Sequence, residues 1–186
     1  TALPSELHSN FIDAFSVIEK FGLTYDNWSP DFLRLPNLAN LARRFPGVTI
    51  VVNHLGGKID VRASDADKLS WRSAIETIAK CPNAVMKLGG AQMRVGEWEP
   101  HFHMNKMTIP QGSEEFINDL LPFYAHAIDC FGPKRCMFES NFPVDKECIS
   151  YRTLWNLFKK LANRLGMSDT EKSSIFYDCA KSTYKL

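Results

Sequence analysis

Short apolar runs alternate with helical patterns along this chain, and few folds accommodate that alternation. The clearest run, Val48–Val52, is a continuous β-branched stretch, typical of a strand buried on both faces of a parallel sheet. Further short strands are predicted at Leu23–Asn27, Ala84–Leu88 and Cys136–Phe138. The order of elements predicts an α/β fold built from four βα units, with about four parallel strands and flanking helices.

Amphipathic helices are predicted between these strands and after the last one. Apolar residues at helical spacing place them at 5–20, 36–45, 69–80 and 113–131, and onward from Tyr151 and from Ser168. Ser5 can cap the first helix and Gly22 ends it, while Ser168 and Glu171 stand at capping-box spacing. The stretch from Ala91 to Gly112 has no clean periodicity, and its length predicts a functional loop or lid.

The overall charge excludes partners that bind through electrostatics alone. Twenty-two basic residues against twenty-one acidic ones give a net charge of +1, so neither nucleic acid nor a membrane is expected as a partner. No apolar run approaches the roughly 18 residues of a membrane span.

The five cysteines form no CxxC pair, which favours free thiols in a reducing cytoplasm. The chain fits one domain or a large piece of one, and because it begins at Thr1 rather than Met a fragment is expected.

Polar and aromatic side chains follow each predicted strand, where a purely structural turn would need only Gly, Asn or Pro. They occur in the stretches Asp26–Trp28, Asn53–His54, Lys87–Gly89 and Glu139–Asn141. In parallel α/β sheets, catalytic groups lie just beyond the C-terminal ends of the strands. The sequence therefore predicts an active site at this edge of the sheet.

His54 is the strongest single candidate in that site. It follows an apolar strand and precedes two glycines, so its imidazole is expected over the strand ends with little cover. There it could act as an acid or base, as a donor to the substrate or as a metal ligand. The alternative is a histidine that only hydrogen-bonds a neighbouring loop.

Asn141 follows the fourth strand beside two carboxylates. An amide cannot act as a general base, so its expected role is to hold a substrate oxygen or a water, the alternative being a cap on the next loop. Glu139 and Asp145 are the nearby groups that could accept a proton. Lys87 lies inside an apolar strand, and it either anchors a substrate or forms a structural ion pair.

Other patterns carry less weight. His101 and His103 suggest a pair of metal ligands, but their Pro-flanked loop lacks a third ligand and favours plain surface histidines. No nucleophile elbow, P-loop or dinucleotide fingerprint is present. Four aromatic residues at helical spacing are expected in the core: Trp155, Phe158, Phe176 and Tyr184.

Three stretches together resemble the amidohydrolase-2 family of the amidohydrolase superfamily. They are Val51–Gly57, Val85–Gly90 and Arg135–Lys146, in this order. The chain looks similar to the branch of lactone and dicarboxylate hydrolases that includes 2-pyrone-4,6-dicarboxylate lactonases. The resemblance implies that residues 1–186 form a single partial domain, the C-terminal half of a (β/α)8 TIM barrel holding strands five to eight.

The chain departs from the family pattern at its usual metal positions. The HxH after strand one has no counterpart, the stretch Trp28–Asp31 lacks the histidine expected after strand five, and Asn141 replaces the water-activating Asp after strand eight. Family members often bind a divalent metal such as zinc, but these departures predict no tightly bound metal in this chain.

The resemblance implies a hydrolase that opens a lactone or similar carbonyl–oxygen bond of a small carboxylated substrate. His54 would polarise the carbonyl or relay a proton, and Asn141 would position water. Lys87 and Arg94 would hold a carboxylate, and Trp28 would pack on the substrate ring; Glu139 is placed with these substrate-binding residues.

Two other functions stay open. One is a truncated, inactive half-barrel that acts as a binding or interaction module, and the other is a decarboxylase of the same superfamily. A half-barrel leaves two strand edges unpaired and one sheet face uncovered. We therefore expect a homo-oligomer, or loops that cover the exposed sheet.

Overall fold

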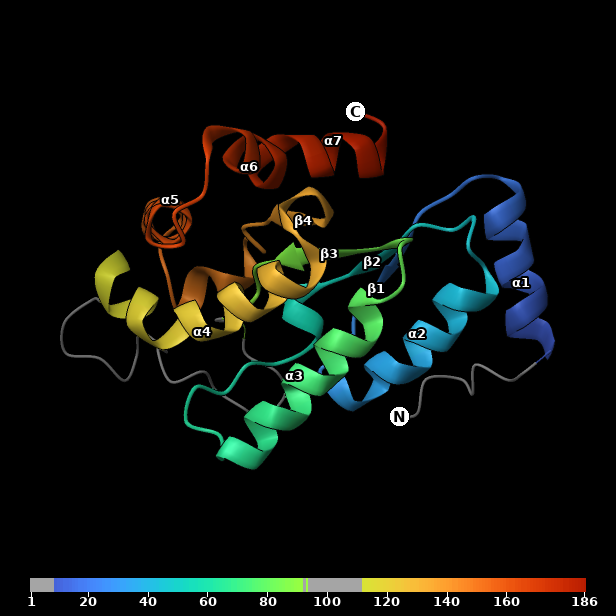
Figure 1. The fold of residues 1–186 in the computed structure, drawn as a ribbon, viewed down its shortest axis with the longest axis horizontal. Coiled ribbons are helices and arrows are strands. Elements are labelled where there is room, and N and C mark those ends of the chain that lie inside the picture. Colours follow the sequence, from blue (N-terminus) through green and yellow to red (C-terminus); the bar gives the residue numbers. More distant parts are fainter. Residues whose placement is uncertain (1–8, 92, 94–111) are drawn as a thin grey trace.

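The sheet of this protein contains four parallel strands in sequence order (Figure 1). The computed structural model describes residues 9–91, 93 and 112–186. The strands are β1 (Tyr25–Asn27), β2 (Ile50–Val52), β3 (Ala84–Leu88) and β4 (Cys136–Phe138). All three strand pairs are parallel, which confirms the α/β fold and the four predicted strands.

Helices connect the strands and follow the last one. The α-helices are α1 (Ser9–Lys20), α2 (Leu35–Arg44), α3 (Asp65–Ala79), α4 (Ser113–Phe131), α5 (Tyr151–Arg164), α6 (Asp169–Ser173) and α7 (Cys179–Tyr184). The short turns are η1 (Phe32–Arg34), η2 (His54–Gly56), η4 (Pro133–Arg135), η5 (Val144–Glu147) and the π-helical η6 (Ser174–Asp178).

Local sequence signals explain most of these boundaries. The Ser168 capping box starts α6, and Gly22 follows α1 with a positive φ of 59°, both as predicted. The helix expected at 69–80 instead begins at Asp65, because the Ser64 side chain accepts a hydrogen bond from the Asp67 amide. The first two strands are shorter than predicted and begin at Tyr25 and Ile50.

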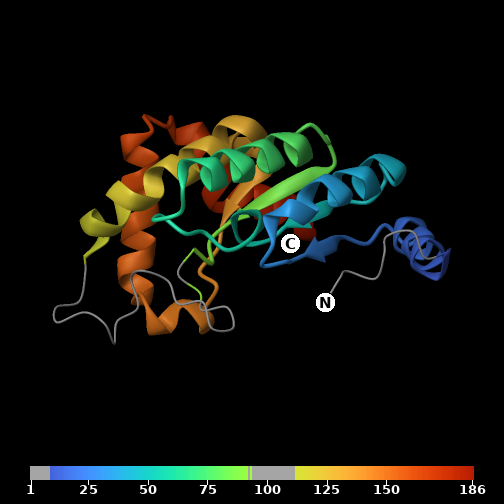
Figure 2. The same cartoon turned by 90° about the horizontal axis from the view of Figure 1, so that it is seen from below.

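The two faces of the sheet differ in what covers them. Helices α2, α3 and α4 pack on one face, where Ala84, Met86 and Leu88 of β3 are fully buried (Figures 1 and 2). Side chains alternate along a strand, so Val85 and Lys87 point to the other face. On that face β3 is only half-buried.

The C-terminal helix α7 lies across this second face, opposite α2 and α3 (Figures 1 and 2). Its Tyr184 hydroxyl donates to Asp26 Oδ1 of β1 at 2.8 Å. Next to it, the Thr24 hydroxyl donates to the Thr183 carbonyl at 3.2 Å. The sequence predicted self-association or loops as cover for this face, whereas the chain's own last helix covers part of it.

In the part of the chain that the structure describes, no helix is both long enough and apolar enough to cross a membrane.

The core lies between the sheet and α2 to α5. It is aromatic at the β4 end, where Phe138 stacks on Phe158 of α5 with ring centroids 4.4 Å apart.

Candidate active site at the strand ends

The chain turns sharply where β2 ends, and this turn sets the position of His54. His54 and Leu55 both have φ of 54°, in the left-handed region that ordinary residues rarely adopt. The buried Trp71 of α3 donates its indole N–H to the Leu55 carbonyl at 3.0 Å, which ties the turn to a helix. His54 is thereby held over the carboxyl end of the sheet.

The His54 imidazole forms a close pair with a carboxylate from β4. Its Nδ1 lies 2.5 Å from Glu139 Oε1, and both side chains are largely buried, with 15% and 17% exposed. A charged acceptor that close to Nδ1 favours the tautomer with the proton on Nδ1. The other ring nitrogen, Nε2, then carries the lone pair.

Two glycines at the end of β3 make room for this pair. A Cβ at Gly90 would lie 2.6 Å from the His54 ring, and a Cβ at Gly89 would overlap Glu139. Gly90 also has a positive φ of 67°. The Gly89–Gly90 pair is therefore required by the close approach of β3 to both side chains.

Lys87 lies between two carboxylates on the second face of the sheet. Its Nζ donates to Asp26 Oδ1 at 2.8 Å and lies 4.0 Å from Glu139 Oε2. Burial lowers the pKa of Lys87, but hydrogen bonds with Asp26 and Tyr184 and the charge of Glu139 outweigh burial and leave this pKa above its usual value. Lys87 is thus a cation held in a network, which fits the ion-pair alternative, and binding of a substrate carboxylate stays a prediction.

Tyr184 joins this network from α7. It was expected in the core, but its ring lies 5.2 Å from Lys87 Nζ and its hydroxyl bonds Asp26. Burial, together with its bond to Asp26, raises the pKa of Tyr184 to about 12, against the opposing effect of Lys87. No local pattern in the sequence indicates this role, because the contact joins residues 158 positions apart.

Asn141 is bonded to a buried acid. Its Nδ2 donates to Asp145 Oδ1 at 2.7 Å, and Asp145 is fully buried. Burial raises the pKa of Asp145 to about 7, although the Asn141 bond and the nearby His54 lower it. Asn141 has φ of 50°, a left-handed conformation that Asn tolerates well.

Trp28 lies beside His54 and remains open to solvent. The two ring centroids are 6.3 Å apart in an edge-on arrangement, and Trp28 is 41% exposed. This placement is compatible with packing on a substrate ring. Arg94 and the pair His101 and His103 lie outside the described residues.

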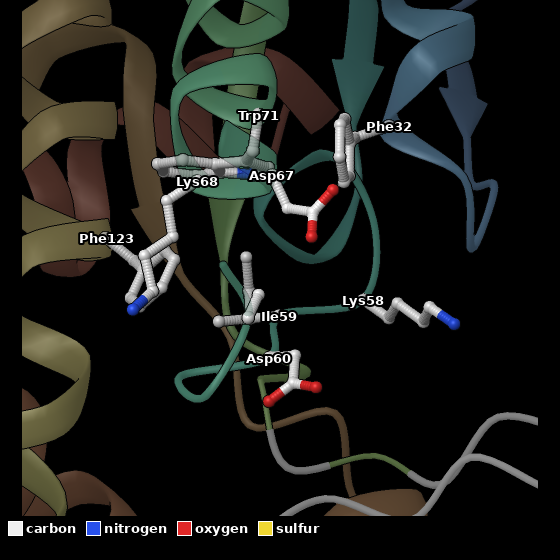
Figure 3. Close-up of a pocket in the computed structure, with 9 residues that line it drawn as sticks. Phe32, Lys58, Ile59, Asp60, Asp67, Lys68, Trp71 and Phe123 are labelled. Atoms are coloured by element: carbon white, nitrogen blue, oxygen red, sulfur yellow. The ribbon is translucent and has the colours of Figure 1, made fainter. Parts of the chain in front are cut away.

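A separate cavity of about 250 Å³ lies outside this cluster, between α3, α4 and the loop after β2. Figure 3 shows Phe32, Trp71 and Phe123 around Ile59, with Lys58 and Lys68 at its rim. Neither His54 nor Glu139 lines it.

A metal site of the family type does not fit the described residues taken alone. Among residues 9–91, 93 and 112–186, no three His, Cys, Asp or Glu side chains are grouped so that they could hold a metal ion.

Curated relatives match most of the chain. The uncharacterized protein y4mH of Sinorhizobium fredii is 34% identical over 92% of this chain and 50% of its own length. An L-fucono-1,5-lactonase of Burkholderia multivorans is 27% identical over 82% of this chain and 48% of its own length. The chain thus spans about half the length of the curated relatives it matches.

Solved structures share the fold. A zinc-bound amidohydrolase of Burkholderia multivorans superposes with a TM-score of 0.80 at 23% identity, over 96% of this chain and 58% of that one. A probable 2-pyrone-4,6-dicarboxylic acid hydrolase of Acinetobacter baumannii gives 0.71 at 14% identity, over 99% and 60%. The coverage is that of a half barrel.

The amidohydrolase family profile matches residues 7–186, nearly the whole chain and every strand that contributes to the cluster around His54. By this match, the chain belongs to the amidohydrolase family.

Proposed function

We propose that this chain carries the acid–base half of a hydrolase that opens the ring ester of a small carboxylated lactone. The observation that carries the proposal is the 2.5 Å pairing of His54 Nδ1 with Glu139 Oε1 at the carboxyl end of the sheet. The L-fucono-1,5-lactonase among its relatives supports the choice of a lactone.

The proposed chemistry needs one proton carrier and one site for water. Glu139 holds His54 in the tautomer whose Nε2 is free to accept a proton, as a general base requires. His54 takes a proton from a water that Asn141 positions, while that water attacks the lactone carbonyl. His54 then gives this proton to the ring oxygen of the lactone as the carbon–oxygen bond breaks.

The remaining residues bind the substrate. Trp28 packs on the ring, and Lys87 supplies positive charge for a substrate carboxylate. Arg94 is proposed as a second ligand of the substrate carboxylate. The activity belongs to the whole protein, because the chain spans only about half of its relatives.

The test is hydrolysis of a panel of sugar and dicarboxylate lactones by the full-length protein. His54→Gln should lower kcat/KM by about 10²-fold or more, the usual contribution of a general base. The control is His126→Gln, since His126 lies on α4 and its Nε2 contacts the Arg72 carbonyl. Wild-type turnover by His54→Gln would overturn the assignment.

A binding module without catalysis is the second candidate. It is favoured by two departures from the family pattern, the stretch Trp28–Asp31 without a histidine and Asn141 in place of an Asp. The same panel separates the two: binding of a lactone by calorimetry without any turnover in the full-length wild type would support the module.

A further inference from the structure

Asp145 is a fully buried carboxylate with one well-formed partner. Asn141 Nδ2 donates to its Oδ1 at 2.7 Å, and the Asp145 amide donates back to the Asn141 carbonyl at 3.2 Å. The Gly90 backbone N–H lies close enough to lower its pKa, but no hydrogen bond of normal geometry reaches Oδ2 in the described part of the chain. Burying a carboxyl group costs free energy unless hydrogen bonds compensate for the lost water, and Asp145 has only one side-chain hydrogen bond of normal geometry. This suggests a functional role for the residue.

The chemistry of the two groups fixes the orientation of the Asn141 amide. An ionised carboxylate accepts hydrogen bonds and donates none, so the atom of Asn141 that faces Asp145 Oδ1 is the NH₂ group. The amide carbonyl Oδ1 then points away from Asp145. Asn141 itself is only half-buried.

We propose that Asp145 is a positioning residue, which turns the Asn141 amide so that Asn141 offers its carbonyl oxygen, an acceptor, to the active site. The catalytic consequence rests on the proposed function. In it, the attacking water donates one hydrogen bond to Asn141 Oδ1 and gives its other proton to His54. Without Asp145 the amide can rotate and present its NH₂ group, which cannot accept from water.

The charged groups around Asp145 come from three elements. His54 of η2 lowers its pKa and Glu139 at the end of β4 raises it. From α4, the buried Tyr124 hydroxyl faces the same region, and its own pKa is raised by burial and then by Asp145 and Glu139. Protonation of Asp145 on Oδ2 leaves Oδ1 as the acceptor for Asn141, so the orientation holds in both charge states.

The orientation can be tested without any substrate. In a ¹⁵N-labelled protein, the Asn141 side-chain amide signals are assigned by their loss in Asn141→Ser. We expect these signals to shift between pH 5 and pH 9 with a midpoint near 7, and this titration to vanish in Asp145→Asn. Glu147→Gln, an exposed change on the same turn η5, should leave them unchanged. Signals that do not move with pH in the wild type would overturn the proposal, and this result needs no variant that folds poorly.

The kinetic arm separates the inference from the proposed function. In the full-length protein, Asp145→Ala should lower kcat by about 10²-fold, the usual effect of a misplaced reactant, with KM little changed, whereas Asp145→Asn, whose Oδ1 still accepts from Asn141, should retain most of the wild-type kcat. If the wild type opens no lactone, the proposed function fails while the amide signals still decide the orientation. If the wild type is active and Asp145→Ala keeps its kcat, the positioning role is wrong.

Discussion

Gly89 and Gly90 lie at the end of β3, directly against Glu139 and His54. Each is the only residue type that fits there, since a Cβ would enter space that the two side chains occupy. The pairing of acid and base thus depends on the strand between them, β3, which also carries Lys87.

Replacing Gly90 by Ala should cost more stability than replacing Gly166 by Ala. The two glycines have φ of 67° and 66°, so the backbone strain of an alanine, about 1–2 kcal/mol, is the same at both. Only at Gly90 does the new Cβ meet the His54 ring, because nothing described lies within 4 Å at Gly166. Urea unfolding of both variants measures the difference. Equal losses would mean that the His54 ring is not held against β3.

Asp145 should make the free energy of unfolding depend on pH. Its pKa is about 7 in the folded protein and 3.8 in an ordinary environment, so between these values the native state binds the extra proton. Burial of Asp145 therefore costs no free energy of unfolding below about pH 4, and the free energy of unfolding falls on its account as the pH rises to about 7. Asp145→Asn should flatten this slope in urea unfolding at pH 4.5 and 7.5. A slope that is unchanged in the variant would contradict the burial of a titrating Asp145.

At the scale of elements, long-range hydrogen bonds hold the turn η2 and the helix α7 in place. Trp71 of α3 bonds the Leu55 carbonyl in η2, and Tyr184 of α7 bonds Asp26 in β1. Both bonds connect the edge of the site to a helix. A change in either helix is therefore expected to alter the positions of the site residues.

Trp71→Phe should destabilise the protein by about 1–3 kcal/mol beyond the lost volume, because the Leu55 carbonyl loses its buried donor. Trp155→Phe is the matched control, since the indole N–H of Trp155 is buried and has no hydrogen-bond partner among the described residues. Thermal unfolding of the two variants measures the difference. A control that is as damaging as Trp71→Phe would show that the bond to Leu55 adds nothing.

Tyr184→Phe keeps the ring over Lys87 but removes the hydroxyl that donates to Asp26. A net loss of about 1 kcal/mol is expected for one hydrogen bond of this kind. The control is Tyr177→Phe, because Tyr177 is 57% exposed. Chemical unfolding distinguishes the two, and an unaffected Tyr184→Phe would mean that α7 is held by other contacts.

The elements that the sequence predicted well are those with strong local signals. The β-branched run before Asn53, the strand Ala84–Leu88 and the Ser168 capping box all follow from neighbouring residues. The strand ends also pointed to His54, Asn141 and Glu139. What the sequence could not supply was the pairing between distant residues, because neither the 85-residue separation of His54 and Glu139 nor the bond from Tyr184 leaves a local pattern.

At the scale of the whole molecule, the sheet has one covered face, one partly covered face and two outer edges. Neither β1 nor β4 has a further strand beside it in the part of the chain that is described. Unpaired edges are templates for association. We propose that the chain self-associates through them, and sedimentation velocity over a range of concentrations checks this; a monomer at every concentration would contradict it.

The central claim is that His54 and Glu139 act as one unit in lactone opening. A double-mutant cycle on the full-length protein tests it most directly, with kcat/KM measured for the wild type, His54→Gln, Glu139→Gln and the double variant. Residues that act together are strongly non-additive, so the double variant should be no slower than His54→Gln alone. Additive losses, or a Glu139→Gln variant as fast as the wild type, would contradict the account.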